Sequence, residues 1–190
     1  MPPFNQITLR TERLLLRPMG EADAPALFAL FSDPRVTRFL SRPPWLTLES
    51  AHERIARDSE AMAAGKYLCM GIAQAASGRL IGECSLFNLM EQCRRAEVGY
   101  TLAFEAWGQG YMNEALNSLL AFGFSQLRLN RIEADIDPRN LASARSLERL
   151  GFKKEGYLRE RWIVSGEVSD SGLYGLLASD WKREGQIIAG

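Results

Sequence analysis

One short segment of the sequence has the residue types needed to hold a large anion. Residues 107–115 read Trp-Gly-Gln-Gly-Tyr-Met-Asn-Glu-Ala and lie between a strand-like segment, 97–103, and an amphipathic helical pattern. Gly108 and Gly110 let the backbone approach a bulky ligand closely. The first turn of a helix presents unpaired N–H groups and a partial positive charge, which together bind phosphate groups. This spacing predicts a phosphate site; the alternative is that the glycines serve only the entry into the helix.

Two polar residues further along the chain share one face of a second helix. Segment 137–143 reads Asp-Pro-Arg-Asn-Leu-Ala-Ser, and Asn140 and Ser143 lie one helical turn apart. Either side chain could contact a ligand, or it could cap the helix, because Asn and Ser are common at helix starts. Gly151 is the expected terminator of this helix.

A carboxylate stands on the strand that leads into the glycines. Alternation along 95–103 places the apolar side chains at positions 98, 100 and 102 on one side and Glu97 on the other. A carboxylate at this point could take a proton from a substrate, or it could be an ordinary strand residue with a structural hydrogen bond.

The elements that must position these residues follow from hydrophobic periodicity and turn residues. Asp33-Pro34 starts a short helical turn, Thr47 and Ser50 indicate a capping box, and Ser77-Gly78 indicates a hairpin. The order mixes hairpins with strand–helix–strand crossovers, which predicts one mixed sheet flanked by helices. Strand patterns cover 7–17, 67–73, 79–87, 95–103, 131–137, 157–164 and 168–177, and helical patterns cover 21–31, 47–64, 112–127 and 140–150.

Bulk properties exclude several classes of protein. The length of 190 residues favours one domain, 1–190, with a loose tail at about 185–190. Lys and Arg number 23 and so do Asp and Glu, so no direct binding of nucleic acid is expected. The sequence shows no signal peptide and no apolar run long enough to span a bilayer, which predicts a cytoplasmic protein that does not bind membranes.

The cysteine and histidine content argues against metal chemistry. Cys69, Cys84 and Cys93 lack metal-binding spacing and are interpreted as buried, reduced thiols. The single histidine, His52, lies in a polar helical segment and is expected to be solvated. The single histidine therefore argues against a Ser-His-Asp triad and a multi-histidine site, and no metal is expected.

Together these segments resemble the GNAT superfamily of acyl-CoA N-acyltransferases, and within it the branch that includes the ribosomal-protein N-acetyltransferases RimJ and RimL. The resemblance covers nearly the whole chain and includes Thr-Glu-Arg-Leu-Leu-Leu-Arg-Pro at 11–18, Glu-Val-Gly-Tyr at 97–100 and Leu-Tyr-Gly-Leu-Leu at 173–177. It implies an α+β, GNAT-like fold with one central, mixed, mostly antiparallel sheet of about seven strands and about four helices. It also implies transfer of an acetyl group from acetyl-CoA to a primary amine.

The resemblance further implies which residues bind acetyl-CoA. This set comprises Val98, Gly99, Tyr100, Trp107, Gly108, Gln109, Gly110, Tyr111, Met112, Asn113, Asn140 and Ser143. Trp107 and Met112 depart from the superfamily pattern, which has Gln or Arg and then Gly or Ala at these points. The basic side chain that some members use on the diphosphate is absent, so phosphate binding is expected to rest on the backbone of 108–113.

The catalytic residues implied by the resemblance are Glu97 and Ser143. Glu97 is the candidate base for the amine, directly or through water. Many members use a tyrosine in the last helix to protonate the departing thiolate, but the matching position holds Leu147. Ser143 is the candidate donor in its place; the alternatives are a structural role for Glu97 and helix capping for Ser143.

The identity of the amine acceptor is what the sequence determines least. The nearest branch suggests the N-terminal amine of a peptide or protein; a small amine, such as a polyamine, aminoglycoside or amino acid, is the alternative, and a non-catalytic acetyl-CoA-binding module is a third. Monomer and homodimer both remain open. Side chains that could line the acceptor site are Trp45, Trp107, Tyr111 and Trp162, and those that could attract an acidic acceptor are Arg42, Arg94, Arg159 and Arg161.

Overall fold

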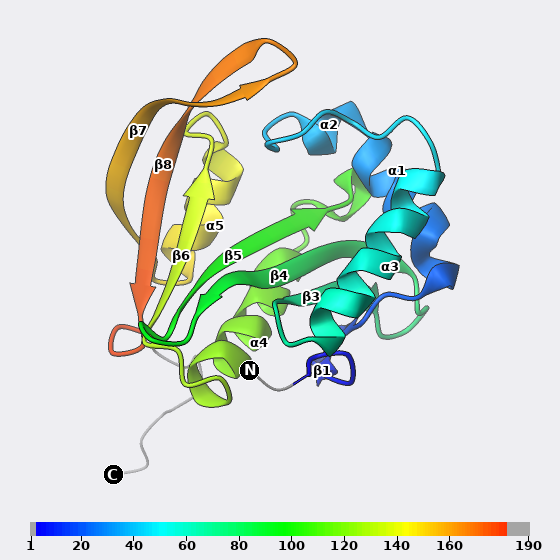
Figure 1. The fold of residues 1–190 in the computed structure, drawn as a ribbon, viewed down its shortest axis with the longest axis horizontal. Coiled ribbons are helices and arrows are strands. Elements are labelled where there is room, and N and C mark those ends of the chain that lie inside the picture. Colours follow the sequence, from blue (N-terminus) through cyan, green and yellow to red (C-terminus); the bar gives the residue numbers. More distant parts are fainter. Residues whose placement is uncertain (1–2, 182–190) are drawn as a thin grey trace.

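The computed structural model describes residues 3–181, which form one eight-stranded sheet with helices on both faces (Figure 1). The strand order is β1-β2-β3-β4-β5-β6-β8-β7, and every neighbouring pair is antiparallel except β5 and β6. The strands are β1 (Leu9–Arg10), β2 (Leu14–Arg17), β3 (Leu68–Gln74), β4 (Leu80–Met90), β5 (Arg95–Leu102), β6 (Arg131–Ile136), β7 (Lys153–Val164) and β8 (Glu167–Leu177). The helices are α1 (Ala24–Ser32), α2 (Pro34–Thr37), α3 (Glu49–Ala63), α4 (Tyr111–Ser125) and α5 (Leu141–Arg149), with 3₁₀ turns η1 (Glu21–Asp23) and η2 (Phe104–Ala106).

The predicted α+β fold with a mixed, mostly antiparallel sheet is confirmed, with small differences in its elements. The segment 7–17 turns back at Thr11, whose N–H donates to the carbonyl of Leu14 at 3.0 Å, so one expected strand becomes β1 and β2. The short helix α2 follows Asp33, whose carboxylate accepts from the N–H of Arg35 as a cap should. The capping box expected at Thr47 is wrong, because α3 starts from Leu48, which has no capping side chain.

The predictions about the tail, the number of domains, membrane spans and the cysteines are tested only in part by this structure. The expected tail, 185–190, lies outside the described residues, and the single-domain assignment stays a prediction. Within residues 3–181, no helix has the length and apolar character needed to cross a bilayer. Cys69 and Cys84 are buried as expected, whereas Cys93 is exposed because it lies in the turn between β4 and β5.

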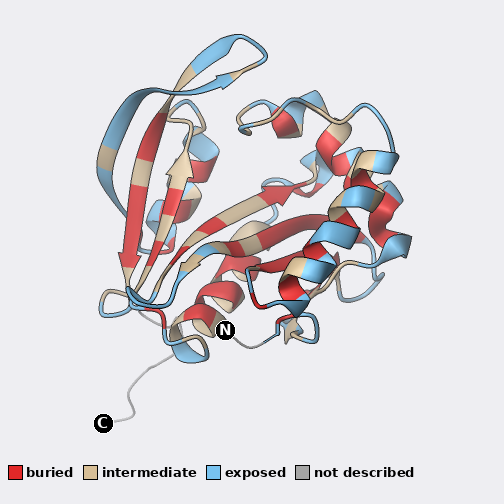
Figure 2. Ribbon diagram, viewed as in Figure 1, coloured by how far each residue is buried: buried red, intermediate tan, exposed pale blue. Residues whose placement is uncertain are grey.

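The sheet separates two apolar clusters, and this holds its central strands in place. On one face, α4 packs Leu116 and Leu119 into the larger cluster. On the other face, Leu27 and Phe31 of α1 pack with Ile55 of α3. Figure 2 shows the result: the central strands are largely buried, while α1 and α3 expose only their outer sides. Burial on both faces fixes the positions of the side chains that the central strands carry.

The parallel pair β5–β6 is short, and the two strands separate beyond it. Their pairing covers only Arg95–Glu97 against Arg131–Glu133. Beyond Glu97, β5 continues beside β4, and beyond Glu133, β6 continues beside β8. Figure 1 shows the two strands diverging from this point. The sheet is thus open at its centre, just where the sequence placed Glu97 and the following residues.

The β7–β8 hairpin forms the outer edge of the sheet and extends past it. β7 is exposed along almost all of its length, whereas the second half of β8 is buried (Figure 2). The tip of the hairpin, at Ser165 and Gly166, turns with positive φ at both residues. In Figure 1 the hairpin lies across an opening from α2, so two separate parts of the chain face each other over the divergent strands.

Candidate active site

A cleft of about 770 Å³ occupies the opening where β5 and β6 separate. One wall comes from α2, the α2–α3 loop and α3. The opposite wall comes from the end of β6, the start of α5 and the β7–β8 hairpin. The floor is formed by β4 and β5. Among the residues predicted to act in catalysis or to bind acetyl-CoA, Glu97, Val98, Gly99, Tyr100, Asn140 and Ser143 line this cleft.

Glu97 lies on the floor and has one side-chain partner among the described residues. Its Oε1 accepts a hydrogen bond from Asn88 Nδ2 at 3.0 Å. Asn88 belongs to a β-bulge in β4, where Phe87 pairs with Glu97 but the next pair is Met90 with Arg95. Asn88 adopts φ 49°, a left-handed conformation that asparagine tolerates better than most residues. The bulge therefore brings an amide beside the Glu97 carboxylate.

Ser143 reaches the floor from α5 and meets Tyr100. The two hydroxyl oxygens lie 2.6 Å apart, and Ser143 is 9% exposed. Burial raises the pKa of Tyr100 to about 12, although the bond to Ser143 opposes this. The tyrosine therefore keeps its proton at neutral pH. Leu147, one turn further along the same buried face of α5, is fully buried in the core and has no group that could donate a proton.

Asn140 caps α5, which was one of the two roles foreseen for it. Its Oδ1 accepts the backbone N–H of Ser143 at 3.0 Å. The Ser143 hydroxyl takes no part in this cap, because it is bonded to Tyr100 instead. Capping thus accounts for the carbonyl oxygen of Asn140 and leaves the Ser143 hydroxyl for another use.

The glycine segment lies outside the residues that line this cleft, at the N-terminus of α4. Gly110 is the residue before the helix, with φ 79°, and Gly108 has φ 73°. Three predicted cofactor residues use their side chains within the protein: Trp107 Nε1 donates to the carbonyl of Leu102 at 2.8 Å, Gln109 Nε2 donates to that of Glu105 at 2.7 Å, and Met112 packs on the core. The backbone remains the part of the segment that is available to a ligand.

Arg13 brings a guanidinium group to this loop, which sequence reasoning missed. Its Nη1 donates to the carbonyl of Gln109 at 3.0 Å, and its Nε donates to Glu114 at 2.7 Å. The guanidinium also lies over the ring of Tyr111, 4.6 Å from its centroid. Burial alone would raise the pKa of Glu114, but hydrogen bonds from Thr11 and Arg13 lower it below its usual range. The charge of Arg13 is therefore largely neutralised, and its clear role is to hold the loop against α4.

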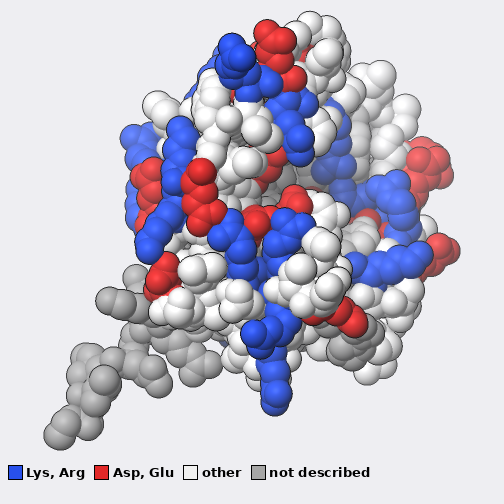
Figure 3. Space-filling model, turned by 60° about the vertical axis from the view of Figure 1, so that its left-hand side comes forward, with Lys and Arg blue, Asp and Glu red and all other residues white. Residues whose placement is uncertain are grey.

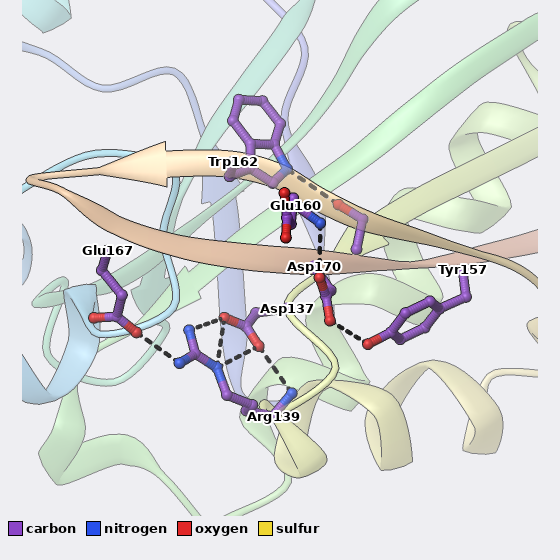
Figure 4. Close-up of polar contacts among 8 residues, drawn as sticks. Asp137, Arg139, Tyr157, Glu160, Trp162, Glu167 and Asp170 are labelled. Carbon is purple, nitrogen blue, oxygen red and sulfur yellow. Dashed lines mark hydrogen bonds and ion pairs between the residues drawn. The ribbon is translucent and has the colours of Figure 1, made fainter.

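A polar network fixes the wall that includes the hairpin (Figure 4). Arg139 bonds Asp137 through Nη2 at 2.6 Å and Glu167, at the start of β8, through Nη1 at 2.6 Å. Further along the hairpin, Asp170 accepts from the Tyr157 hydroxyl and from the N–H of Glu160. The Arg139–Glu167 bond ties the tip of the hairpin to the loop before α5, and the Asp170 bonds hold the two strands of the hairpin together.

The opposite end of the floor holds a buried cluster around Arg54. Its Nε donates to Asp58 at 2.6 Å, and its Nη2 lies 3.3 Å from Glu83 and 3.7 Å from Cys69. The ligand atoms of Asp58, Cys69 and Glu83 lie within 4.8 Å of one another, close enough for a metal ion. The guanidinium supplies the positive charge that such an ion would bring. Burial raises the pKa of Cys69, so its thiol stays protonated.

Only some of the aromatic and basic residues considered for the acceptor reach the cleft. Trp162 lines it, whereas Trp45 packs on Phe31 with ring centroids 4.6 Å apart. Arg42 and Arg161 also line it. The remaining members of those sets, Trp107, Tyr111, Arg94 and Arg159, are not among its lining residues.

Comparison with known proteins decides the family. The model of the acetyltransferase (GNAT) domain matches residues 13–153. The chain belongs to the GNAT acetyltransferase family. Because GNAT acetyltransferases take their acyl group from acetyl-CoA, this chain is an acetyl-CoA-dependent N-acetyltransferase. The match contains the glycine segment, Glu97 and Ser143, so the candidate site lies within the family domain.

The names of the relatives of this GNAT chain give different substrates, or none. The uncharacterized N-acetyltransferase p20 of Bacillus licheniformis is 37% identical over 92% of this chain and 98% of its own length. The [ribosomal protein uS5]-alanine N-acetyltransferase of Escherichia coli (strain K12) is 28% identical over 93% of both chains. A structure of spermidine N-acetyltransferase from Vibrio cholerae with CoA and spermine has a TM-score of 0.79 over 90% of this chain and 98% of its own. At 22% identity, the last likeness shows the fold alone.

The residues present fit acetyl-CoA as the co-substrate. A Cβ atom placed on Gly108 would meet no atom within 4 Å, so the outer side of the loop has room for a diphosphate. Asn113 Oδ1 is buried and has no hydrogen-bond partner among the described residues, so it can accept a bond from a ligand. Positions 98–100 follow the point where β5 loses β6 as a neighbour, and their backbone can bond the amides of a pantetheine arm.

We expect Gly110→Val to weaken acetyl-CoA binding at least tenfold while the enzyme stays folded. The added Cβ would lie 3.5 Å from Arg13 Nη2, and the valine methyl groups would crowd the loop backbone that is expected to hold the diphosphate. Gly78→Val is the matched control, because Gly78 also has positive φ, 70°, but lies in the β3–β4 turn with open space around it. Both variants carry the strain of a β-branched residue with positive φ, so their melting temperatures should fall alike. Calorimetric titration with acetyl-CoA measures the difference; equal affinities in the two variants would mean that the loop does not bind the phosphates.

Proposed function

We propose that this enzyme acetylates the N-terminal amine of a peptide or protein by direct attack of the amine on the thioester. The observation that carries the proposal is that Glu97 and the Tyr100–Ser143 pair line one cleft at the divergence of β5 and β6. Two walls from separate parts of the chain bound this cleft, which suits an acceptor that enters as the end of a chain. The similarity to a ribosomal-protein alanine N-acetyltransferase supports the same class of acceptor.

Glu97 prepares the amine for attack. An α-amine has a pKa near ~8 and a lysine-type amine near ~10.4, so an α-amine is already partly uncharged at neutral pH. The Glu97 carboxylate takes the remaining proton, directly or through a water molecule. Asn88 holds one oxygen of this carboxylate and so fixes its orientation. Because a thioester is already activated, alignment of the two reactants supplies much of the remaining acceleration.

Tyr100 and Ser143 act on the leaving group. The Ser143 hydroxyl donates a hydrogen bond to the sulfur as the C–S bond breaks. The Tyr100 hydroxyl donates to Ser143 Oγ, which orients the serine proton away from the tyrosine and towards the cleft. As the C–N bond forms, the nitrogen becomes positively charged and gives one proton to the Glu97 carboxylate, which has passed any earlier proton to solvent. As the C–S bond breaks, the thiolate takes a proton from the hydroxyl pair, and the pair regains one from solvent. Overall, an uncharged amine and the thioester give an amide and a thiol. One acetyl group is transferred, and no proton is gained or lost.

Glu97→Gln should lower kcat by a factor of about 10²–10⁴, the usual range for loss of a general base. The loss should be largest at pH 6 and smaller at pH 9, because a larger fraction of an α-amine is uncharged at the higher pH. Acetyl-CoA affinity should change little. The control is Glu53→Gln, an exposed carboxylate of α3 that does not line the cleft. Unchanged turnover of the Glu97 variant across pH 6–9 would remove this residue from the mechanism.

Ser143→Ala and Tyr100→Phe should each slow turnover by about a hundredfold or more with little loss of stability, since each removes one hydroxyl. If the two hydroxyls act as a unit, the double variant should be no slower than the slower single variant. Tyr174→Phe is the control, because Tyr174 is a buried tyrosine, 5% exposed, that does not line the cleft. Losses that multiply in the double variant would show two independent roles.

The acceptor class is tested with a panel that includes peptides with free and blocked N-termini, spermidine, an aminoglycoside and amino acids. Thiol release measures the rate and mass spectrometry locates the acetyl group. Peptide N-terminal amines should show the highest kcat/KM, and blocked peptides that lack lysine should show none. A higher kcat/KM for spermidine or an aminoglycoside would replace this proposal with the small-amine alternative.

A further inference from the structure

One wall of the cleft carries guanidinium groups that the protein itself leaves without a carboxylate partner. Arg38 follows α2, Arg42 lies in the α2–α3 loop, and Arg57 lies on α3; all three line the cleft. Within residues 3–181, none of them makes a hydrogen bond or an ion pair with another side chain. Arg54, on the same face of α3, differs because Asp58 and Glu83 hold it.

Arg42 is fixed in place by aromatic rings instead of by acids. Its guanidinium carbon lies 4.3 Å from the ring centroid of Phe31 and 5.8 Å from that of Trp45. Such contacts engage the face of the guanidinium and leave its N–H edges for a bidentate acceptor such as a carboxylate or phosphate. Burial and the neighbouring Arg54 and Arg57 lower the pKa of Arg42, against the opposing effect of Glu83 and Asp58. Arginine nevertheless remains charged at any physiological pH.

The acids of the cleft lie on the floor and on the opposite wall. Asp137 and Glu167 are held by Arg139, and Asp135 lies 3.9 Å from Arg161. Glu97 is the acid left with only an amide partner among the described residues. Figure 3 shows that Lys and Arg alternate with Asp and Glu over the side that carries the hairpin, so this face has no single sign. The unpaired positive charge is therefore concentrated on the α2–α3 wall.

Removing a guanidinium charge partly from water costs free energy of folding unless an anion binds it. Asp58 and Glu83 act on Arg42 only through space, since both are bound to Arg54, so an anion that bonds the Arg42 guanidinium directly would come from outside the described residues. The amine of a molecule bound in the cleft would lie at the Glu97 carboxylate. Another group of the same molecule would lie at Arg38, Arg42 and Arg57, which together are called the arginine wall.

Building on the proposed function, we propose that the acceptor carries an anionic group near its reacting amine, and that Arg42, with Arg57 and Arg38, binds this group. The occupant that fits is a peptide N-terminus followed closely by aspartate or glutamate. A polyamine fits poorly, because its additional positive charges would face the same arginines.

The test compares peptides that are identical except for their second and third residues, which are Glu-Glu, Gln-Gln or Lys-Lys. Amino acids and their uncharged amides form a second matched set, so that the charge preference is measured whichever acceptor class the enzyme prefers. For each, kcat/KM is measured, and calorimetry measures binding to the CoA complex without turnover. The acidic member should be preferred over the amide by about ten- to hundredfold, the scale of one or two charge-assisted hydrogen bonds.

Variants then assign the preference to this wall. Arg42→Gln and Arg57→Gln should each move the acid-to-amide ratio towards 1, and Arg42→Lys should restore only part of it, because lysine lacks the planar fork. Arg57 is exposed and its substitution leaves the core intact, so its result stands even if loss of the Arg42 stem destabilises the fold. Arg10→Gln, an exposed arginine of β1 outside the cleft, should leave the ratio unchanged.

The outcomes separate this inference from the proposed function. Acetylation of peptides with equal kcat/KM and equal affinity for the acidic and amide members would overturn the anionic acceptor but keep the peptide acceptor. Acetylation of amino acids alone, still with the acid preferred over its amide, would overturn the peptide acceptor but keep the arginine wall. A preference for the Lys-Lys peptide or for spermidine would overturn the inference outright.

Discussion

The short pairing of β5 with β6 is the constraint on which the site depends. Each strand is bound along its outer side by an antiparallel partner, β4 or β8, for more residues than it is bound to the other. The parallel ladder therefore ends after three residue pairs, and the sheet opens instead of twisting further as one unit. Backbone N–H and C=O groups at the opening need partners, which a ligand rich in amides can provide. The cleft and the region of the chain available to the pantetheine arm both result from this one break.

Ion pairs between distant segments hold the parts that surround the opening. Arg13, between β1 and β2, binds the glycine loop and the first turn of α4. Arg54 joins α3 to β4, and Arg139 joins the loop before α5 to the hairpin. Exposed ion pairs contribute little to stability singly, but here each fixes the position of an element that lines the site. Among the arginines that line the cleft, Arg54, Arg139 and Arg161 each have an acidic partner, whereas those that lack one among the described residues, Arg38, Arg42 and Arg57, lie on one wall.

Much of this arrangement could be predicted from the sequence. The contacts that were not predicted were missed for a physical reason. Periodicity located the strands and helices within a few residues, and alternation correctly placed Glu97 opposite the apolar side chains of β5. The contacts of Arg13 and the Tyr100–Ser143 bond join residues that are 96 and 43 positions apart. Local patterns carry no information about such pairs; only the packing of α5 on the face of β5 that carries Tyr100 brings that pair together. The β-bulge at Asn88 was also missed, since asparagine in a strand pattern gives no distinct signal.

These contacts change the interpretation of Leu147, which stands in α5 where many family members have a tyrosine. Leu147 is buried, so a hydroxyl there would have to displace core packing before it could reach a thiolate. The phenol is found instead on β5, at Tyr100, and Ser143 bridges it to the cleft. A hydroxyl pair carried by two different elements can thus offer a donor while Leu147 keeps its place in the core. The leucine, which alone would favour a binding module without catalysis, is therefore compatible with a complete set of groups for acetyl transfer.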